Sequence, residues 1–511
     1  MAIEPKYERL VSSERKKLGV TQSVIECCLP ANDSNEIKKV MCANAKSFIL
    51  NSEAQNGEVV FNGNVNFQVI YENENGEFNG LDYTADFKDK FLNDEINMLS
   101  TPVVTSSVVD VNTSISGQDV KVVAIVEITV EIIKNTENNS LMLVSGDNVY
   151  YNTDTIKVSN FIGVLLSKFE NGYDIEIKDN VLKVLEVTCS PYIETVIPQE
   201  KFAKVVGGAN IDICYVSSGE TNMLRTYQTK VSFTEEVALE QLTEKSCVQS
   251  HLNINNSLIK ITTNIDVDYA VVNLNLPYEY IGYAFNEREV EVVNDIFSTE
   301  NFLRVNTESF NTVKCGGKLN LESKVSGSVE SDDKSYDEVL GTCCNTVTIA
   351  TSFIEMGNLI LEGVASTTVL YFNKETNSTH STVVEMPFSL SEPANDLTES
   401  FMPVVNVSLG EITAKIKRGR DLEVSATLFV YTDFYSVNPE AVITDISVLE
   451  DKPECEAVLT IYVVKTGETI WDIAKQLNVN PDSLLEQNPQ VLLPLVGGEK
   501  FIVYRQREMQ F

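Results

Sequence analysis

The chain has 511 residues, of which 43% are hydrophobic and 22% are charged, a composition typical of soluble globular domains. Its 39 basic and 74 acidic residues give a net charge of −35, which repels phosphate backbones and anionic lipid surfaces and excludes nucleic acid as an expected partner. A chain of this length is expected to form about three to four domains, each able to bury a core.

Membrane insertion is not expected from the sequence. The N-terminus lacks the apolar core of a signal peptide. The longest apolar stretch, VKVVAIVEITVEII at 120–133, is interrupted by three charged residues and is too short to span a bilayer. Two short basic clusters, at 15–17 and 415–420, are expected to be solvated strand edges or turns.

Residues 1–20 are expected to form an N-terminal tail and residues 21–140 a first β-rich repeat. The segment GNVNFQVIY, from Gly63 to Tyr71, alternates polar and apolar residues and predicts a strand. The turn NENG at 73–76 predicts a hairpin, because Asn and Gly tolerate positive φ. The next strand is expected to end near Phe87, and a long alternating strand at 119–133 closes the repeat.

Residues 141–275 and 276–440 repeat this pattern, with Gly207 and Tyr215 in one copy and Gly363 and Tyr371 in the other. The matching elements are turns at 217–220 and 373–378, strands that end near Phe233 and Phe388, and closing strands at 257–272 and 421–435. Such long spacing is unlike a solenoid and predicts three β-rich, sandwich-like domains arranged as beads. The repeated Gly is expected at a bulge or strand entry and the repeated Tyr at a half-buried core position.

Little helix is expected in the three repeats, with a short helix at 289–302 as the main candidate. Irregular linkers are expected near 134–140, 273–278 and 436–453, because these segments are rich in Asn, Pro and Ser. Residues 441–458 are assigned as the linker to the C-terminal segment.

No catalytic residue, metal ligand or cofactor site is expected. His251 and His380 are the only histidines; they lie in different repeats and are expected to be exposed turn or strand-edge residues. The sequence contains no zinc-binding spacing and no phosphate-binding loop. Ten cysteines without a C-x-x-C pair favour reduced thiols in a cytosolic protein. The vicinal pairs Cys27–Cys28 and Cys343–Cys344 are the candidates for redox activity.

The C-terminal segment 459–506 has a different texture and predicts a small βααβ domain. Leu459–Val464 resembles a strand, and Thr469 with Asp472 forms a capping-box-like start of a helix. Asn480 followed by Pro481 marks a second helix, and Phe501–Tyr504 returns as a strand.

This segment closely resembles a LysM domain, a family that commonly binds N-acetylglucosamine glycans. The matching residues are Tyr462, Val464, Lys465, Gly467, Thr469, Ile470, Trp471, Ile473, Ala474, Val479, Leu484, Asn488, Pro489, Gly498 and Phe501; Glu468 stands where the family usually has Asp. The resemblance places a binding groove between loops Gly467–Ile470 and Asn488–Leu493. The implied partner- or glycan-binding residues are Lys465, Gly467, Glu468, Thr469, Ile470, Trp471, Lys475, Asn488, Pro489 and Leu493.

The order of three β-rich repeats followed by LysM resembles spore-coat assembly proteins, in which SPOCS-type domains precede a C-terminal LysM domain. That resemblance implies a non-catalytic protein in the mother-cell cytoplasm, at the forespore surface and spore coat. It also implies that the LysM domain binds the coat morphogenetic ATPase, with other coat proteins as further partners.

Three functions are weighed at this point: coat assembly through protein binding, binding of peptidoglycan with N-acetylglucosamine glycan as the ligand, and an unrecognised hydrolase. The role of Trp471, the single tryptophan of the chain, is also open. It is either a core filler or an anchor for a partner.

Overall fold

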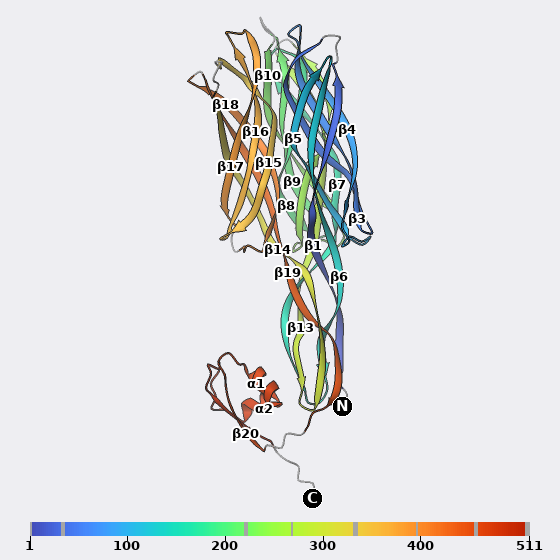
Figure 1. Cartoon of the computed structure of the whole chain (residues 1–511), viewed down its shortest axis with the longest axis vertical. Coiled ribbons are helices and arrows are strands. Elements are labelled where there is room, and N and C mark those ends of the chain that lie inside the picture. Colours follow the sequence, from blue (N-terminus) through green and yellow to red (C-terminus); the bar gives the residue numbers. More distant parts are fainter. Residues whose placement is uncertain are drawn as a thin grey trace.

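The computed structural model describes residues 3–31, 36–218, 223–266, 269–330, 336–394, 397–418, 420–453 and 458–505. Three β-sandwich units stand side by side, a stalk built from their long strands projects from one end, and a small domain lies beside the far end of the stalk (Figure 1). Both α-helices of the described residues belong to this small domain. The predicted mainly β fold is confirmed.

The first unit is a sandwich of two three-stranded antiparallel sheets, with strand orders β1-β6-β5 and β2-β3-β4. Alternating side chains of β6, from Val120 to Ile132, face Val65, Phe67 and Tyr71 of β3 across a continuous core, as expected for strands with one buried face. The strands are β1 (Glu4–Pro30), β2 (Ile37–Gln55), β3 (Glu58–Asn73), β4 (Phe78–Leu92), β5 (Thr101–Ser116) and β6 (Asp119–Ser145).

The second unit repeats this topology with one interruption. Its meander has the order β10-β9-β8, and its other sheet centres on β13, which pairs with β7 along one edge and with β11 and β12 along the other. The elements are β7 (Val149–Ile177), β8 (Val181–Gln199), β9 (Phe202–Ser217), β10 (Met223–Ala238), β11 (Cys247–Ile254), the 3₁₀ turn η1 (Asn256–Leu258), β12 (Lys260–Ile265) and β13 (Ala270–Ser298). The closing strand predicted at 257–272 is therefore wrong: β13 closes the unit.

The third unit again pairs its first strand with its last, in the orders β14-β19-β18 and β15-β16-β17. The strands are β14 (Asn301–Glu330), β15 (Glu338–Glu355), β16 (Asn358–Asn373), β17 (Ser378–Pro393), β18 (Met402–Lys417) and β19 (Asp421–Asp451). In this unit the closing strand covers the segment predicted at 421–435, and the exposed basic residues 415–418 lie at the end of β18 and the start of the following turn.

The repeated glycines have a shared steric reason. Gly63, Gly207 and Gly363 lie opposite Phe87, Phe233 and Phe388 on the neighbouring strand. A Cβ at these glycines would lie 2.4, 2.5 and 2.3 Å from a main-chain oxygen of the other neighbouring strand, and each phenylalanine ring also contacts the glycine position. The repeated tyrosines Tyr71, Tyr215 and Tyr371 are buried rather than half-buried.

The stalk forms because the first and last strands of each unit are much longer than its other strands. Each pair runs past its sandwich and ends at the same tip, where Glu4 pairs with Ser145, Val149 with Ser298 and Asn301 with Asp451. The stalk interior is apolar and draws on all three pairs; its buried residues are Leu10, Leu141, Val144, Ile156, Val158, Val290, Val292, Val293, Ile296, Phe310, Val442 and Ile443.

Several expectations from the sequence are wrong because the segments concerned form the stalk. From Glu4 onward the expected N-terminal tail is strand β1. The expected linkers at 134–140, 273–278 and 436–453 lie largely inside β6, β13 and β19, as do the boundaries expected after residues 140, 275 and 440. The segment 289–302 is not helical, because it ends β13 and begins β14. Polar and apolar side chains alternate along these segments. An antiparallel strand tolerates the polar side chains on the face that is exposed to solvent.

The three units are not beads on a string, because their sandwiches pack against one another. Buried residues from all three meanders share one apolar cluster, which includes Ile70, Val216 and Leu370. Arg15, expected in a solvated basic cluster, is 3% exposed at a second junction. It pairs with Glu131 of its own unit and contacts residues of the other two units, whereas the neighbouring Lys16 and Lys17 are exposed as expected.

The second and third units are also linked covalently by a disulfide between Cys247 of β11 and Cys315 of β14, with a Cα–Cα distance of 6.2 Å. A register shift between Cys315 and Lys318, with Gly317 at φ 88°, bends β14 at this point. The expectation that all thiols are reduced is therefore wrong for this pair. Cys455 lies outside the described residues.

Candidate functional site

The C-terminal domain contains the residues with the strongest sequence signal for binding. Its elements are β20 (Leu459–Val463), α1 (Ile470–Leu477), α2 (Pro481–Glu486) and β21 (Lys500–Tyr504), with β20 and β21 antiparallel. This is the predicted βααβ order. Its core combines Val464, Ile473, Ala474, Leu484, Phe501 and Val503.

The turn before α1 is braced by its own polar side chains. Thr469 caps the helix: its hydroxyl accepts from the Asp472 amide, and the Asp472 carboxylate accepts from the Thr469 amide at 2.9 Å. Glu468 accepts from the Tyr462 hydroxyl at 2.7 Å and from the Lys465 amide at 2.8 Å. These bonds lower the pKa of Glu468, the amide bond having the largest effect. Glu468 therefore shapes the turn, and Gly467 supplies its positive φ of 89°.

Asn488 also holds the fold together and does not face solvent. It is buried, its amide nitrogen donates to the carbonyl oxygens of Leu484 and Ile502, each at 2.8 Å, and its side-chain oxygen accepts from the Ile502 amide at 2.7 Å. These bonds join the end of α2 to β21. Pro489, the next residue, is exposed.

The segment before the first implied loop contacts the segment that follows the second implied loop. Gly497 packs on Thr466, where a Cβ would lie 2.9 Å from the threonine hydroxyl, and the Gly498 amide donates to the Val464 carbonyl at 2.8 Å. The surface formed by the turn 465–469 and the loop 489–497 is called the loop surface below. Its exposed apolar residues are Leu492 (82% exposed), Leu493 (58%) and Val496 (75%).

Two other candidate residues point elsewhere, because α1 docks on the tip of the stalk. The Trp471 indole nitrogen donates to the Asp295 carboxylate at 2.8 Å, and Lys475 Nζ donates to its two oxygens at 2.6 and 2.7 Å. The Trp471 ring also meets Phe297 edge-on, with centroids 5.0 Å apart. Nearby, the Asn478 amide nitrogen donates to the Thr299 carbonyl oxygen. Trp471 thus anchors the small domain to β13 of the same chain.

The ten candidate residues therefore separate into three groups. Glu468, Thr469 and Asn488 build the domain; Trp471 and Lys475 join it to the stalk; Lys465, Gly467, Pro489 and Leu493 are exposed on the loop surface, with Ile470 half-buried beside it. Asp295 and Phe297, which contact Trp471 from the stalk, are far from it in sequence. Nothing in the sequence around them indicates a role in binding the small domain. Leu492 and Val496 were detectable as part of the apolar run VLLPLV at 491–496.

Removal of the Asp295 carboxylate should release the small domain from the stalk. Asp295→Ala deletes the acceptor of charge-assisted bonds and should weaken docking by about 2–3 kcal/mol. Because Trp471 is the single tryptophan, its fluorescence reports docking directly: emission should shift to the red and acrylamide quenching should increase. Glu289→Ala, an exposed change earlier in β13, is the control and should leave the emission unchanged.

The docking contact should also be insensitive to pH across the neutral range. Burial opposes the charge of Asp295, but the bonds from Lys475 and Trp471 outweigh it and lower the pKa below the ordinary 3.8. A carboxyl group whose pKa is lowered by docking stabilises the docked state at every pH above its ordinary pKa of 3.8. That stabilisation is lost only as the pH falls through the lower pKa of the docked state. A change of tryptophan emission between neutral and mildly acidic pH would contradict this assignment.

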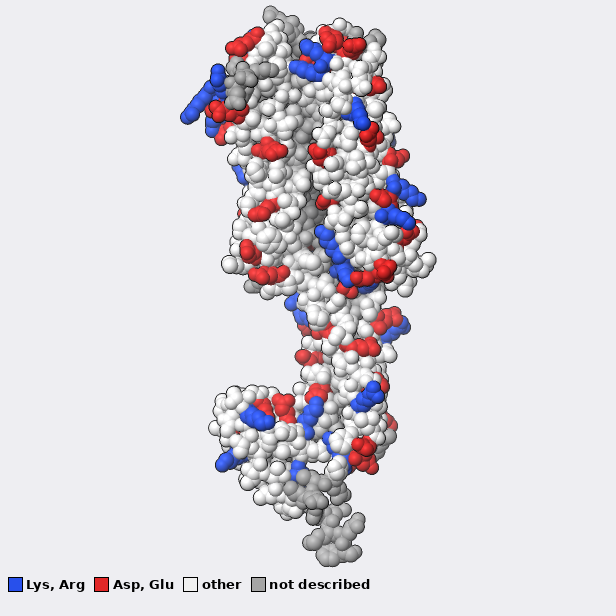
Figure 2. All heavy atoms as spheres, in the orientation of Figure 1, with Lys and Arg blue, Asp and Glu red and all other residues white. Residues whose placement is uncertain are grey.

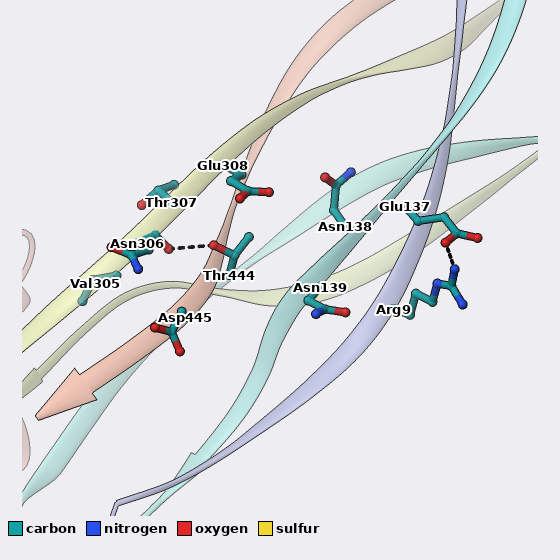
Figure 3. A pocket seen from close by; sticks show the side chains of 10 residues that line it. All are labelled: Arg9, Glu137, Asn138, Asn139, Val305, Asn306, Thr307, Glu308, Thr444 and Asp445. Atoms are coloured by element: carbon teal, nitrogen blue, oxygen red, sulfur yellow. Dashed lines mark hydrogen bonds and ion pairs between the residues drawn. The ribbon is translucent and has the colours of Figure 1, made fainter. Parts of the chain in front are cut away.

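A polar groove of about 850 Å³ in the stalk is lined by residues of β1, β6, β14 and β19 (Figure 3). Arg9 pairs with Glu137, and the Thr444 hydroxyl donates to the Asn306 carbonyl oxygen. Figure 3 shows the carboxylates of Glu137, Glu308 and Asp445 well separated. Neither histidine lines this groove. His380 bonds with Thr376 and Ser378. His251 is half-buried on β11, contrary to the expected exposure, and burial lowers its pKa to about 3.

The visible surface carries acidic and basic side chains interspersed over head, stalk and small domain, without a large basic patch (Figure 2). In the described part of the chain, neither α-helix has the length and apolar character needed to cross a membrane.

Comparison with known families identifies two parts of the chain. Residues 36–127 match the family model described as SipL, SPOCS domain, and residues 462–491 match the model described as LysM domain. The first match covers β2 to β5 and the beginning of β6. The second begins in the last two residues of β20 and covers α1, α2 and the start of the loop that follows. Searches among curated proteins and among solved structures found no match.

Proposed function

Because residues 36–127 match a SipL SPOCS domain and residues 462–491 match a LysM domain, we propose that the protein assembles the spore coat by binding the coat morphogenetic ATPase through its LysM domain. Both matched families are non-catalytic. In this proposal the protein acts in the mother-cell cytoplasm, at the surface of the forespore.

The apolar character of the loop surface is the observation that favours a protein ligand. Residues 491–496 contain no polar side chain, and three of them are strongly exposed. Exposed apolar residues gathered in one short loop are typical of protein interfaces. A sugar ligand needs hydrogen-bonding side chains placed around a cleft. Two polar residues of the turn already bond within the domain: Glu468 accepts from the Tyr462 hydroxyl and the Lys465 amide, and Thr469 bonds with Asp472.

The three sandwiches supply a rigid support for this binding domain. They share apolar cores at their junctions, and the stalk holds the LysM domain away from the heads (Figure 1). We propose that the heads bind other coat proteins, so that one chain connects the ATPase layer to further coat layers.

Co-elution tests the proposal. The full-length protein mixed with the purified coat morphogenetic ATPase should elute as a complex, and a shortened chain without residues 455–511 should elute alone. Equal binding by the shortened chain would refute a role for the LysM domain.

Sedimentation with insoluble peptidoglycan separates this function from the glycan alternative. The proposal expects the intact protein to stay in the supernatant at background level. Pelleting that requires residues 455–511, together with no binding to the ATPase, would assign the LysM domain to N-acetylglucosamine glycan instead.

A further inference from the structure

Three buried thiols meet where the meanders of the first and third units pack together. Cys42 lies on β2, and Cys343 and Cys344 are neighbours on β15. Their sulfur atoms all lie within 4.8 Å of one another, and the Cys343 thiol donates to the Cys42 sulfur at 3.1 Å. Among the residues that the structure describes, this is the one group of three His, Cys, Asp or Glu side chains close enough to share a metal ion.

The two adjacent cysteines reach the same site because β15 is bulged there. Successive side chains of a regular strand point to opposite faces. Between Cys343 and Thr346 the register shifts, and Cys344 adopts a positive φ of 53°. Both thiols are therefore turned into the interior, where they are 3% and 7% exposed. A non-glycine residue in this conformation is uncommon, and bulges of this kind often serve to redirect a side chain.

The second unit contributes a buried carboxylate at the corresponding position. Glu186 of β8 pairs with Cys214 of β9, seven residues after Gly207, and Cys42 pairs with Ile70 of β3, seven residues after Gly63. The repeat therefore places Glu186 and Cys42 at equivalent points around the junction. Glu186 is 7% exposed, and both of its carboxylate oxygens lack a hydrogen-bond partner.

A buried side-chain oxygen without a hydrogen-bond partner is uncommon and calls for an explanation. Lys46 interacts with Glu186 but donates its bonds to the Cys189 carbonyl and the Ser190 hydroxyl.

We propose that Cys42, Cys343 and Cys344 form a structural zinc site at the junction of the units. Glu186 is the candidate for the fourth ligand, and its carboxylate lies outside the group of three closely spaced sulfur atoms. Zinc prefers four ligands in tetrahedral geometry, and Zn–S distances of about 2.3 Å imply sulfur atoms about 3.8 Å apart. The three sulfur atoms here lie within 4.8 Å of one another, with 3.1 Å between those of Cys42 and Cys343. On binding, each thiol releases its proton and the zinc ion accepts three thiolates and one carboxylate.

A disulfide between Cys42 and Cys343 is the competing explanation for their short separation. It would use two sulfur atoms and would leave the Cys344 thiol and the Glu186 carboxylate unexplained, whereas a zinc ion accounts for all four groups. The sequence did not predict this site, because its ligands come from three repeats and have no C-x-x-C spacing.

Metal analysis of the full-length protein tests the site. After desalting without a chelator, the wild type should contain one zinc ion per chain by mass spectrometry of the elements. Cys42→Ser and Cys343→Ser should contain none. Cys189→Ala, which removes another buried thiol outside the triplet, should keep the zinc. Glu186→Gln should lower the zinc affinity at least tenfold in a chelator competition.

Cobalt substitution of the wild-type protein covers the case in which the serine variants fail to fold. Co²⁺ bound by three thiolates should give an intense sulfur-to-cobalt band in the near ultraviolet and the visible bands of a tetrahedral ion. The site is overturned if the wild type contains no zinc and shows no cobalt bands, if peptide mapping finds Cys42 disulfide-bonded to Cys343, or if the serine variants keep their zinc.

Discussion

Arg15→Ala should lower the free energy of unfolding by about 3–5 kcal/mol, the range measured when one partner of a buried ion pair is removed. The guanidinium Nε donates to Glu131 at 2.6 Å, and another of its nitrogens donates to Gln249. It also lies over the rings of Tyr283 and Tyr435, at 5.8 and 5.0 Å from their centroids. One side chain therefore contacts all three units.

The loss has two sources. Glu131, whose side chain is 16% exposed, is left without its counter-charge, and the two tyrosine rings lose a cation that is worth more when desolvated. Arg9→Ala is the matched control: Arg9 lies on the same strand and also pairs with a glutamate across the sheet, but its side chain is 66% exposed. Its removal should cost no more than about 1 kcal/mol.

Urea denaturation followed by circular dichroism at a β-sheet wavelength measures both variants. Arg15→Lys keeps the charge but loses the planar fork, so its midpoint should lie between those of the wild type and Arg15→Ala. Equal midpoints for Arg15→Ala and Arg9→Ala would show that the buried cation does not hold the units together.

His251 should make the protein lose stability on mild acidification. Burial, and then the charge of Arg15, lower the pKa of its imidazole to about 3, from an ordinary value of 6.5. As pH falls below 6.5 the unfolded chain binds a proton that the folded protein does not, so stability decreases until pH reaches about 3. Between pH 6.5 and 5 this amounts to about 2 kcal/mol for one group.

The contribution is isolated by comparing wild type with His251→Phe at several pH values. Asp212 and Asp433 oppose the effect, because burial raises the pKa of each to about 6 and their contribution grows as pH falls towards the ordinary 3.8. Both carboxyls are present in wild type and variant, so they cancel in the difference. The free energy of unfolding of His251→Phe, relative to that of the wild type, should increase by about 2 kcal/mol between pH 7 and pH 5. A gap that does not change with pH would show that His251 titrates normally.

The elements within each repeat could be predicted because their signals are local. The Gly-x₇-Tyr strands, the turn at 73–76 and the βααβ order of the C-terminal domain follow from alternation, turn residues and helix caps, and the structure has them at those places. The strand that follows each of these tyrosines also places a phenylalanine opposite the repeated glycine; these are Phe87, Phe233 and Phe388.

The arrangement of the units could not be predicted, because it depends on contacts across hundreds of residues. Segments such as KNTENNS at 134–140 are as polar as linkers, and only their pairing with β1 makes them strands. Arg15 looks like a surface residue until tyrosines from two other units close over it. Trp471 packs against a core that the small domain shares with Phe297 of the stalk, and its hydrogen-bond partner Asp295 lies 176 positions away in sequence.

The affinity of the intact protein for the purified coat morphogenetic ATPase, measured by titration calorimetry, tests the central proposal most directly. Leu493→Glu places a charge on the loop surface and should weaken binding at least tenfold, or about 1.4 kcal/mol. Leu459→Glu is the control, because this leucine is equally exposed (57% against 58%) but lies on β20, and it should bind like wild type. Unchanged affinity for Leu493→Glu, or loss of binding with Leu459→Glu alone, would contradict the assignment of the loop surface as the site of coat assembly.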